Sequence, residues 1–378
     1  MYKRQTHPVK FFEKGDKPLE IVTSRQWYIR NGGRDSELRA ALIARGDEMQ
    51  WHPSYMQTRY TNWIDGLNGA WLISRQRFIG VPIPLWYRLD DTGQPLWDDP
   101  LTPTEDTLPV DPTTDAPAGY DEAQRGAPGG FFGEPDVMDT WATSSLTPQI
   151  VCGWEEDPDL YERTYPMDLR PQAHDIIRTW LFSTAVRSHL EADTAPWAHC
   201  ALSGWVLDPD RKKMSKSKGN VITPIDMLAQ YGSDAVRYWA ANGRPGTDTA
   251  VDEGQMKVGR KLAVKILNAS RFALGFGAGT EEELTIDEVA ISHPLDRAML
   301  ASLAELVDEA TRALEGFDYA RALERTEAWF WDFSDDHLEL VKSRAYEGDR
   351  ADADSARHAL RLAISTAVSY THLRAHET

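Results

Sequence analysis

The sequence has little cysteine, no long apolar segment and no excess of positive charge. Cys152 and Cys200 are the only cysteines among 378 residues, too few for the disulfide framework of a secreted domain. No run of 18 or more apolar residues occurs, and the N-terminus has no apolar signal segment. We therefore expect a cytoplasmic protein with no membrane association.

The charge balance and one absent motif limit the classes of binding partner and of nucleotide enzyme that the sequence allows. The net charge of −18 argues against nonspecific nucleic-acid binding over the whole surface, although it leaves room for a local basic patch. A P-loop needs the run Gly-x-x-x-x-Gly-Lys-Ser/Thr, which does not occur, and this excludes the generic P-loop nucleotide enzymes. The length of the chain predicts about two or three compact domains.

Residue patterns divide the chain into an α/β part and a helical part. Strand-like and helix-like runs alternate over residues 136–239, with a helix predicted over 175–190 and a strand over 201–207, which favours an α/β layer. Residues 90–130 are rich in Asp, Thr, Pro and Gly, and we expect a surface insertion without regular structure there. A helical bundle follows, with amphipathic helices predicted over 256–274, 294–314, 319–342 and 353–367.

Two shorter helices are predicted from local signals. A charged helical segment covers residues 36–46. Thr223 followed by Pro224 is typical of a helix start, with Thr223 as the N-cap and Pro224 at the first helical position.

A lysine-rich loop carries the sharpest chemical signal. It lies between Gly204 and Asn220 and contains the run Lys213-Met214-Ser215-Lys216-Ser217 after a predicted strand. Ammonium groups on a loop can close over a polyphosphate and stabilise the negative charge that develops during phosphoryl chemistry. A loop of this composition is also often a plain solvated turn, and serines favour turns in any protein.

Two further segments contain candidate binding residues. In the run Gln172-Ala173-His174-Asp175, at the start of a predicted helix, His174 and Asp175 could be a cap, a metal-ligand pair or a grip on ribose hydroxyls. The second segment, residues 136–145, includes Asp139 and Trp141. The Trp141 indole would serve either as a dry wall for a small apolar ligand or as ordinary core.

Together these segments resemble the class I aminoacyl-tRNA synthetases. Residues 213–217 spell the KMSKS loop of that family, and the flanking runs Gly-Trp-Val-Leu-Asp and Gly-Asn-Val-Ile-Thr-Pro match as well. The resemblance covers almost all of residues 8–368. It implies an α/β fold, namely the C-terminal part of a Rossmann-like catalytic domain followed by an all-α anticodon-binding helical bundle.

The resemblance implies a role for each candidate residue. Lys213 and Lys216 would be catalytic, because they would stabilise charge on the phosphates as an amino-acid carboxylate attacks ATP. The pocket for the amino acid would include Asp139 and Trp141. The family's usual glycine is replaced by Ala173 in the site for ATP and adenylate, which would comprise Met214, Ser215, Lys216, Ser217, Gln172, Ala173 and Asp175.

Weaker roles are implied for the helices beyond the loop. One face of the helix predicted over 256–274 is basic and carries Lys257, Arg260, Lys261 and Lys265. This face would either contact tRNA phosphates or simply be solvated. In the run from Tyr231 to Trp239, we expect Asp234 to cap a helix and Arg237 to form an ion pair.

The resemblance also implies domain boundaries. Residues 6–65 would be the end of an editing insertion of the CP1 type, and 66–250 the C-terminal half of the catalytic domain with a surface insertion at 88–130. Residues 251–368 would form an incomplete anticodon-binding domain. Both ends, residues 1–5 and 369–378, resemble translated adapter sequence and are expected to be non-native, with ordinary frayed termini as the alternative.

Sequence details within these segments indicate one branch of the family. The run Asp175-Ile176-Ile177 and the segment 137–149 resemble the valyl branch, with the isoleucyl and leucyl branches as alternatives. This implies activation of valine by ATP and transfer to the 3′ end of tRNA(Val), with Mg²⁺ accompanying ATP. No cysteine pair follows Trp86 and Tyr87, so zinc is not expected there. An oligomer is not expected either.

One family signature does not occur in the sequence. The His-x-Gly-His turn that begins the nucleotide-binding fold is absent, as is the threonine-rich core of the editing domain. We therefore expect this polypeptide by itself to lack aminoacylation activity and to have marginal solubility, because a divided sheet exposes strand edges. A tRNA-binding module without catalytic activity is the alternative from another class.

Overall fold

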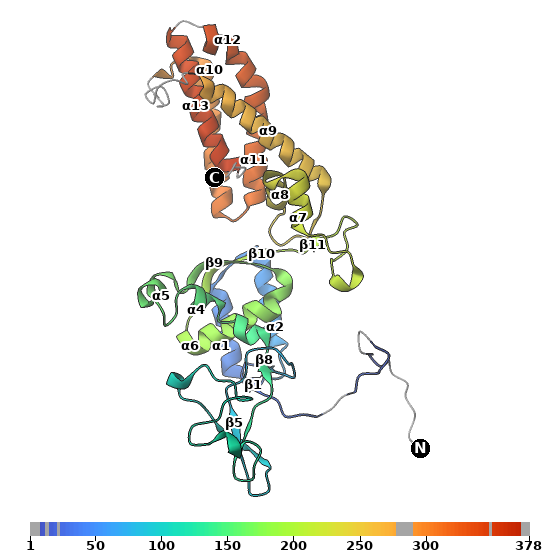
Figure 1. Ribbon diagram of the computed structural model, residues 1–378. Coiled ribbons are helices and arrows are strands. Elements are labelled where there is room, and N and C mark those ends of the chain that lie inside the picture. Colours follow the sequence, from blue (N-terminus) through green and yellow to red (C-terminus); the bar gives the residue numbers. More distant parts are fainter. Residues whose placement is uncertain (1–7, 12–14, 21–22, 277–289, 348–349, 372–378) are drawn as a thin grey trace. The chain divides into compact units, whose positions relative to one another are not determined.

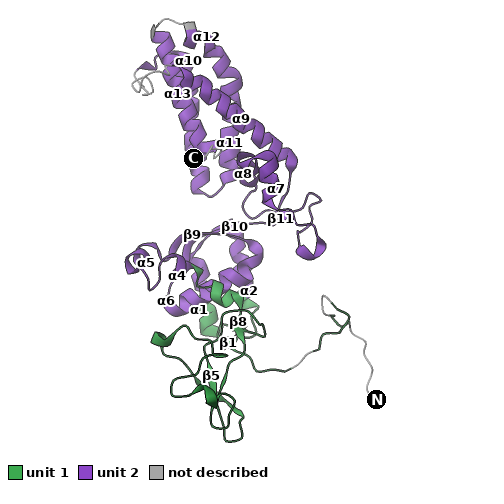
Figure 2. Cartoon of the chain, viewed as in Figure 1, with its two compact units in different colours: residues 1–42, 64–147 green, residues 43–63, 148–378 purple. Residues whose placement is uncertain are grey.

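The computed structural model describes residues 8–11, 15–20, 23–276, 290–347 and 350–371. The chain forms two compact units (Figure 2), of which unit 1 comprises residues 1–42 and 64–147 and unit 2 comprises residues 43–63 and 148–378. Of the ends predicted to be non-native, residues 1–5 and 372–378 lie outside the described residues. Residues 369–371 are described, and they continue the last helix.

Short antiparallel strand pairs organise unit 1. β1 (Tyr28–Ile29) pairs with β3 (Trp71–Leu72), and β4 (Ser74–Arg75) pairs with β8 (Val137–Met138), which α3 (Thr140–Ser144) follows. The helix predicted over 36–46 is confirmed as α1 (Ser36–Glu48). Its start is set by Asp35, whose Oδ1 accepts hydrogen bonds from the backbone N–H groups of Glu37 and Leu38, donors that a helix start leaves unpaired.

A three-stranded antiparallel sheet corrects the prediction that residues 90–130 lack regular structure. β5 (Trp86–Leu89) lies between β6 (Pro95–Leu101) and β7 (Phe131–Gly133), and Trp86 and Phe131 are almost completely buried. The two prolines and two aspartates of β6 argue against a strand. They are tolerated because β6 lies at the edge of this sheet, where a missing backbone N–H costs little. Two 3₁₀ turns, Glu105–Thr107 and Glu122–Gln124, lie between β6 and β7.

A parallel three-stranded sheet forms the α/β part of unit 2. β10 (Trp197–Ser203) lies between β2 (Gln50–His52) and β9 (Met167–Ala173) and is parallel to both (Figure 1). The strand predicted over 201–207 is misplaced, since β10 begins four residues earlier and Gly204-Trp205 separate it from β11 (Val206–Leu207). The break falls where a Cβ atom on Gly204 would stand 2.2 Å from the Thr247 backbone, an approach that only glycine allows.

Helices connect the strands of this sheet. The 3₁₀ turn Ser54–Met56 leads into α2 (Gln57–Asp65), and α4 (Thr147–Val151) and α5 (Pro158–Thr164) precede β9. The helix predicted over 175–190 is confirmed in outline. It begins with a 3₁₀ turn, His174–Ile176, and a π-helical turn, Ile177–Leu181, before α6 (Phe182–Ala192). Short π-helical turns are often found at functional sites.

After the lysine loop the chain forms two short helices and a strand. α7 (Pro224–Tyr231) confirms the predicted start at Thr223, although the Thr223 side chain makes no capping hydrogen bond. The prediction that Asp234 caps α8 (Ser233–Ala241) is wrong. The N-cap is Gly232, and Asp234 lies inside the first turn, where it forms the expected ion pair with Arg237 at 3.7 Å. β12 (Thr249–Ala250) then pairs with β11.

Long helices form the rest of unit 2 and confirm the predicted bundle: α9 (Glu253–Gly275), α10 (Pro294–Glu315), α11 (Tyr319–Asp332), α12 (Leu338–Glu347) and α13 (Arg350–Thr371). A π-helical turn, Phe333–His337, joins α11 to α12 without a loop. Alanines at 356, 359, 363 and 367 are fully buried and let α13 pack closely on its neighbours. In the described ranges no helix is both long and apolar enough to cross a membrane.

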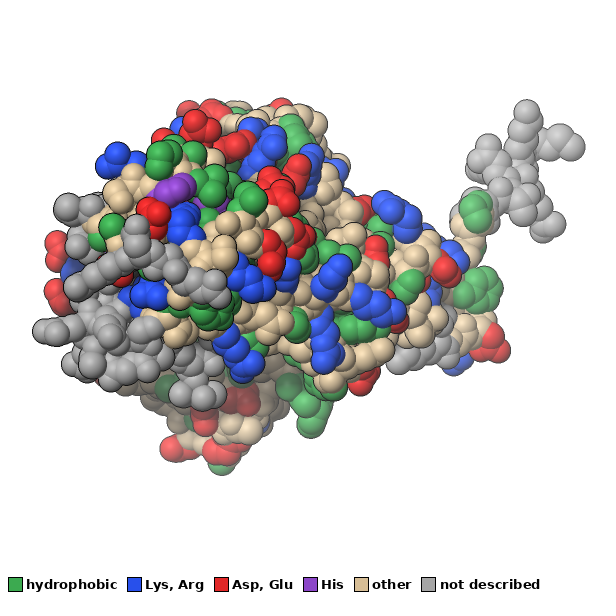
Figure 3. Space-filling model, turned by 90° about the horizontal axis from the view of Figure 1, so that it is seen from above, with side chains coloured by type: hydrophobic (Ala, Val, Ile, Leu, Met, Phe, Trp, Pro, Cys, Tyr) green, Lys and Arg blue, Asp and Glu red, His purple; other side chains and the backbone are tan. Residues whose placement is uncertain are grey.

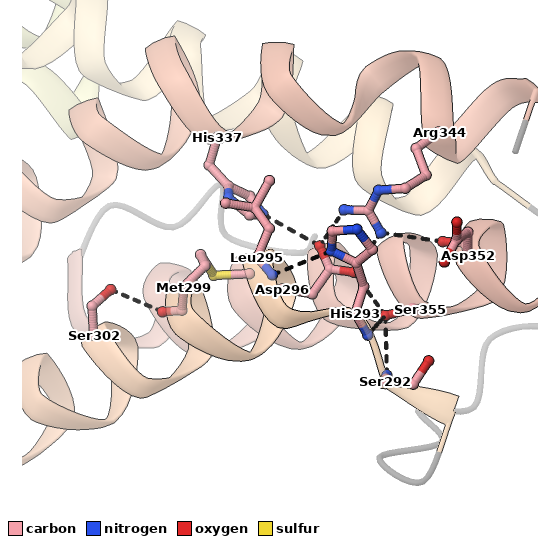
Figure 4. Close-up of polar contacts among 10 residues, drawn as sticks. All are labelled: Ser292, His293, Leu295, Asp296, Met299, Ser302, His337, Arg344, Asp352 and Ser355. Carbon is pink, nitrogen blue, oxygen red and sulfur yellow. Dashed lines mark hydrogen bonds and ion pairs between the residues drawn. The ribbon is translucent and has the colours of Figure 1, made fainter.

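A buried ionic group, the Asp296 cluster, joins three helices of the bundle and comprises Asp296, His337, Arg344 and Ser355 (Figure 4). Asp296 has no exposed surface and accepts hydrogen bonds from Arg344 at 2.7 and 2.6 Å and from Ser355 Oγ at 2.7 Å. Burial by itself raises the pKa of Asp296, but the hydrogen bonds from Arg344 and Ser355 outweigh it and lower that pKa.

Candidate functional site

The lysine loop, residues 208–220, is closed at its base by two side chains. Asn220 Nδ2 donates a hydrogen bond to Asp208 Oδ2 at 2.8 Å, and Asn220 Oδ1 accepts one from the Ser215 N–H at 3.0 Å. Asp208 Oδ1 accepts from the Lys212 N–H at 2.7 Å. The hydrogen bonds from Asn220 and Lys212 lower the pKa of Asp208 and keep the carboxylate ionised. Both ends of the loop are therefore fixed.

The centre of the loop faces solvent. Lys216 and Ser217 are exposed and begin the 3₁₀ turn Lys216–Lys218, which ends at Gly219 with a φ of 67°. Among the contacts of the described residues, Lys216 has no ion pair. The Ser215 and Ser217 hydroxyl oxygens lie 3.3 Å apart, and Met214 Sδ accepts a hydrogen bond from the backbone N–H of Ile222 at 3.4 Å. Met214 thus anchors the loop, whereas Lys216 is available to a ligand.

Lys213 connects the loop to the helix start after β9. Its Nζ atom lies 3.7 Å from Asp175 Oδ2 and 4.0 Å from the centre of the Trp205 ring. The Trp205 ring contacts His174 at 4.8 Å between centroids, and His174 Nε2 is 3.6 Å from Asp248 Oδ1. The structure therefore brings together the two predicted site segments, residues 213–217 and 172–175, although they are far apart in the sequence.

A cavity of about 310 Å³ lies at the carboxyl ends of the parallel strands. Gln172 and Ala173 of β9 line it, together with His52 of β2 and with Leu202 and Ser203 of β10. This edge of a parallel sheet is where α/β proteins bind ligands. Gln172 is 8% exposed, and neither its amide nitrogen nor its amide oxygen has a hydrogen-bond partner among the described residues. Buried polar groups without partners are rare, so Gln172 is suited to meet a ligand.

Asp139 and Trp141 belong to unit 1, whereas the other predicted site residues belong to unit 2. Asp139 is buried, and its Oδ2 atom lies 3.1 Å from Arg75 and accepts a 3.4 Å hydrogen bond from Trp71. It therefore holds β3 and β4 to the start of α3. Trp141 is partly exposed on α3. That the two residues line an amino-acid pocket stays a prediction.

The basic residues predicted to meet tRNA are on α9, namely Lys257, Arg260, Lys261 and Lys265. Arg260 donates to the Gln230 carbonyl at 3.1 Å, Lys265 pairs with Asp335 at 2.7 Å, and Lys261 lies 5.6 Å from the centre of the Trp331 ring. Basic and acidic side chains are intermixed on the face seen in Figure 3. Three of the four side chains thus already contact other residues of unit 2. The role of all four in tRNA binding stays a prediction.

Sequence reasoning missed Asp208, Trp205 and Asn220 as site residues. A signal was available, because Asp208 and Asn220 bracket the lysines and a loop that presents charge needs a fixed base. Of the three roles considered for His174, capping does not occur, since the N-cap is Ala173 and no side-chain cap is formed. Within the part of the chain that the structure describes, no group of three or more His, Cys, Asp and Glu side chains is placed to hold a metal ion.

Two family models match the chain. One, described as tRNA synthetases class I (I, L, M and V), matches residues 10–252, and one described as anticodon-binding domain of tRNA ligase matches residues 296–373. The second match includes the first five residues of the tail, 369–378, so the non-native character of that tail stays a prediction.

The chain is similar to proteins named valine–tRNA ligase. It is 67% identical to the one from Thermobifida fusca over 360 residues and 62% identical to the one from Salinispora tropica over 363 residues. These matches cover 95% and 96% of this chain but 40% and 42% of the relatives. The chain thus spans about two fifths of the length of these relatives.

Solved structures show the same fold at low sequence identity. A methionyl-tRNA synthetase of Mycobacterium tuberculosis bound by methionyl-adenylate matches with a TM-score of 0.64 and 19% identity, over 95% of this chain and 62% of that one. A leucyl-tRNA synthetase complex from Agrobacterium radiobacter K84 matches with a TM-score of 0.59 and 18% identity, over 80% of this chain and 40% of that one.

These matches confirm the predicted fold class, a class I synthetase catalytic domain region followed by a helical region of the anticodon-binding type. The family model covers well over half of the chain, and the lysine loop with its partner at Asp175 lies inside the matched range. The chain belongs to the class I tRNA synthetase family of the isoleucyl, leucyl, methionyl and valyl enzymes.

Proposed function

We propose that a protein carrying this chain is a valine–tRNA ligase, which activates valine with ATP and transfers it to the 3′ end of tRNA(Val) in the cytoplasm. The choice of valine is supported by the identity of 67% to a relative of that name. The ATP-dependent step rests on one observation, the 3.7 Å contact between Lys213 and Asp175, which joins the two segments expected to hold the nucleotide.

The proposed chemistry follows from charge. When the valine carboxylate attacks the α-phosphate of ATP, negative charge grows on the phosphoryl oxygens and on the departing pyrophosphate. The ammonium groups of Lys213 and Lys216 stabilise that charge more than the charge of the bound reactant, which is what accelerates the step. The Lys213 side chain is 52% exposed and Asp175 is 34% exposed, so Lys213 can exchange this contact for a phosphate at small cost.

The remaining contacts of ATP are proposed at the strand ends. Asp175, once freed from Lys213, accepts hydrogen bonds from ribose hydroxyls, and the unpaired amide of Gln172 meets the nucleotide beside Ala173. Mg²⁺ accompanies ATP, held chiefly by phosphate oxygens and water as is usual for this ion. Trp141 and Asp139 are proposed to face the valine side chain, and Lys257 with its neighbours on α9 to face tRNA.

The test is made in a protein of the relatives' full length that contains this sequence. Lys213→Ala combined with Lys216→Ala should lower the rate of valine-dependent exchange between pyrophosphate and ATP by about 10³-fold, since removal of one such donor costs about 10²–10³. Lys212→Ala is the matched control, because this lysine is 71% exposed and its ammonium pairs with Asp210 at 3.6 Å. An unchanged rate in the double variant would refute the role of the loop.

The choice of amino acid is tested separately. The same exchange assay with valine, isoleucine and leucine should favour valine in kcat/KM. Because one methylene changes discrimination by only about 10–200-fold, the ratio between valine and isoleucine needs to be measured and not only the presence of activity. A preference for isoleucine or leucine would leave the loop chemistry intact and overturn the valyl assignment.

A further inference from the structure

A second cavity, of about 650 Å³, lies in unit 1 and has no part in the function proposed above. Its lining includes four aromatic side chains, Trp27, Tyr87, Trp97 and Phe132. The Tyr87 and Trp97 rings lie 4.8 Å apart with 59° between their planes, and the Trp97 and Phe132 rings lie 6.4 Å apart at 78°. We name these four residues the aromatic pocket. Rings set at steep angles around one space present π faces to a ligand from more than one side.

Two carboxylates, those of Glu134 and Asp136, also line the aromatic pocket. Glu134 is 6% exposed, accepts hydrogen bonds from Tyr87 Oη at 2.6 Å and Trp27 Nε1 at 3.0 Å, and fixes the two rings in place. Burial and the Glu134 carboxylate raise the pKa of Tyr87, so its hydroxyl stays protonated and keeps donating. Asp136 is partly exposed, with Gln76 donating to its Oδ2 atom at 2.7 Å.

The chain segment that supplies three of the four rings of the aromatic pocket is strongly acidic. Residues 86–136 contain twelve Asp and Glu residues and only two arginines, Arg88 and Arg125. Both arginines already pair with acidic neighbours, Arg88 with Asp99 at 3.2 Å and Arg125 with Glu122. A field of this sign repels phosphate and attracts cations, which argues against a nucleic-acid strand as the occupant.

One guanidinium already lies on a wall of the aromatic pocket. The Arg25 guanidinium carbon is 5.3 Å from the centre of the Trp97 ring, within the range of a cation–π contact, and Arg25 is an exposed residue. The geometry therefore accommodates a flat cation on Trp97, and Arg25 holds that place with a side chain that is free to leave it.

From these observations we propose that the aromatic pocket is a docking site for an arginine side chain on a basic segment of a partner protein. The guanidinium stacks on Trp97, with Tyr87 and Phe132 lining the same cavity and the carboxylate of Asp136 as an acceptor for its N–H groups. The acidic residues of 86–136 attract the rest of the segment. Arg25 competes with the incoming arginine for the same ring and so weakens its binding.

The test uses the 378-residue chain and an acetylated, amidated peptide that contains two arginines among glycines, with binding measured by titration calorimetry. A peptide of the same sequence with citrulline, which keeps the shape of arginine without its charge, is the matched ligand. The arginine peptide should bind at least five-fold tighter than the citrulline peptide, and added salt should weaken its binding. Equal binding of the two peptides would overturn the proposal.

Variants of the chain locate the site. Trp97→Ala should weaken binding of the arginine peptide at least five-fold, whereas Trp97→Phe, which keeps an aromatic face, should retain part of it. Trp154→Ala is the control, because Trp154 is 37% exposed and lies in unit 2. If Trp97→Ala fails to fold, Asp136→Asn serves instead and should weaken binding two- to five-fold.

Arg25→Gln gives the most specific result. An ordinary lining residue would weaken binding when replaced, but loss of a competing guanidinium should tighten binding of the peptide about two- to three-fold. Tighter binding of a single-stranded oligonucleotide than of the arginine peptide would contradict the proposal. So would an affinity for the arginine peptide that Trp97→Ala leaves unchanged.

Discussion

The lysine loop and the Asp296 cluster both bring a basic side chain to a carboxylate, but they do so in opposite surroundings. Lys213 and Asp175 are 52% and 34% exposed and lie 3.7 Å apart, whereas Asp296 and Arg344 are 0% and 14% exposed and lie 2.6 Å apart. An exposed, long contact can be exchanged for another anion at little cost, while a buried, saturated one cannot. The comparison separates a contact suited to ligand exchange from one that maintains the fold.

The largest effect is expected where the buried contact is broken. Asp296→Ala leaves the Arg344 guanidinium enclosed without its partner, which typically costs about 3–5 kcal/mol. The midpoint of urea unfolding of the chain, followed by the helical circular dichroism signal, should fall accordingly. Asp308→Ala, on the same helix but at an exposed position, is the matched control and should leave the midpoint almost unchanged. A loss under about 1 kcal/mol in Asp296→Ala would show that the cluster does not hold the bundle together.

A smaller effect is expected at the base of the lysine loop. Asn220→Ala removes the hydrogen bonds to Asp208 Oδ2 and to the Lys213 backbone carbonyl and the one from the Ser215 N–H, but it leaves both lysine side chains unchanged. Because the lysines then sample more positions, valine activation by a protein of the relatives' full length should slow about ten-fold, the equivalent of about 1.4 kcal/mol. The unfolding midpoint should change little, so a result in which stability falls and the rate does not would reject the positioning role.

The same contrast explains which features could be predicted from the sequence. The ends of the bundle helices were predicted to within five residues, although the helix predicted over 319–342 is divided into α11 and α12, because a period of 3.6 is a local pattern repeated over many turns. The loop at 213–217 was predicted from its composition and flanks. The bundle helices and the loop are both encoded by residues that are consecutive in the sequence.

Features that depend on distant residues were not predicted. β6 contains residues that argue against a strand, and it forms because β5 offers an edge for it to pair with. The limits of β10 depend on the approach of Thr247 to Gly204, and the Asp208–Asn220 contact depends on a turn that brings the ends of the loop together. Such contacts follow from tertiary structure, which single-sequence patterns do not encode.

Acid is expected to destabilise the Asp296 cluster through His337. Burial lowers the pKa of His337 from its ordinary value of 6.5, so the unfolded chain takes up a proton first as the pH falls. Stability from this group is therefore complete above pH 6.5 and is lost as the pH falls below it, by at most about 1.4 kcal/mol per pH unit. His337→Gln should lose less stability than the parent chain between pH 7 and 5.5. Between pH 8 and 7 the two should differ much less in slope, because the imidazole is then mostly neutral in both states.

The smallest effect is expected at an ion pair that is more exposed than either of the two compared. Arg163 and Asp159 lie one turn apart on α5 at 2.8 Å, with 63% and 81% of their side chains exposed. Water screens such a pair, and ordering two long side chains offsets most of the attraction, so Arg163→Ala should change the free energy of unfolding by less than about 0.5 kcal/mol. Short distance alone would rank this pair with Asp296 and Arg344. A loss approaching that of Asp296→Ala would mean that distance, and not enclosure, determines what a charged contact contributes in this protein.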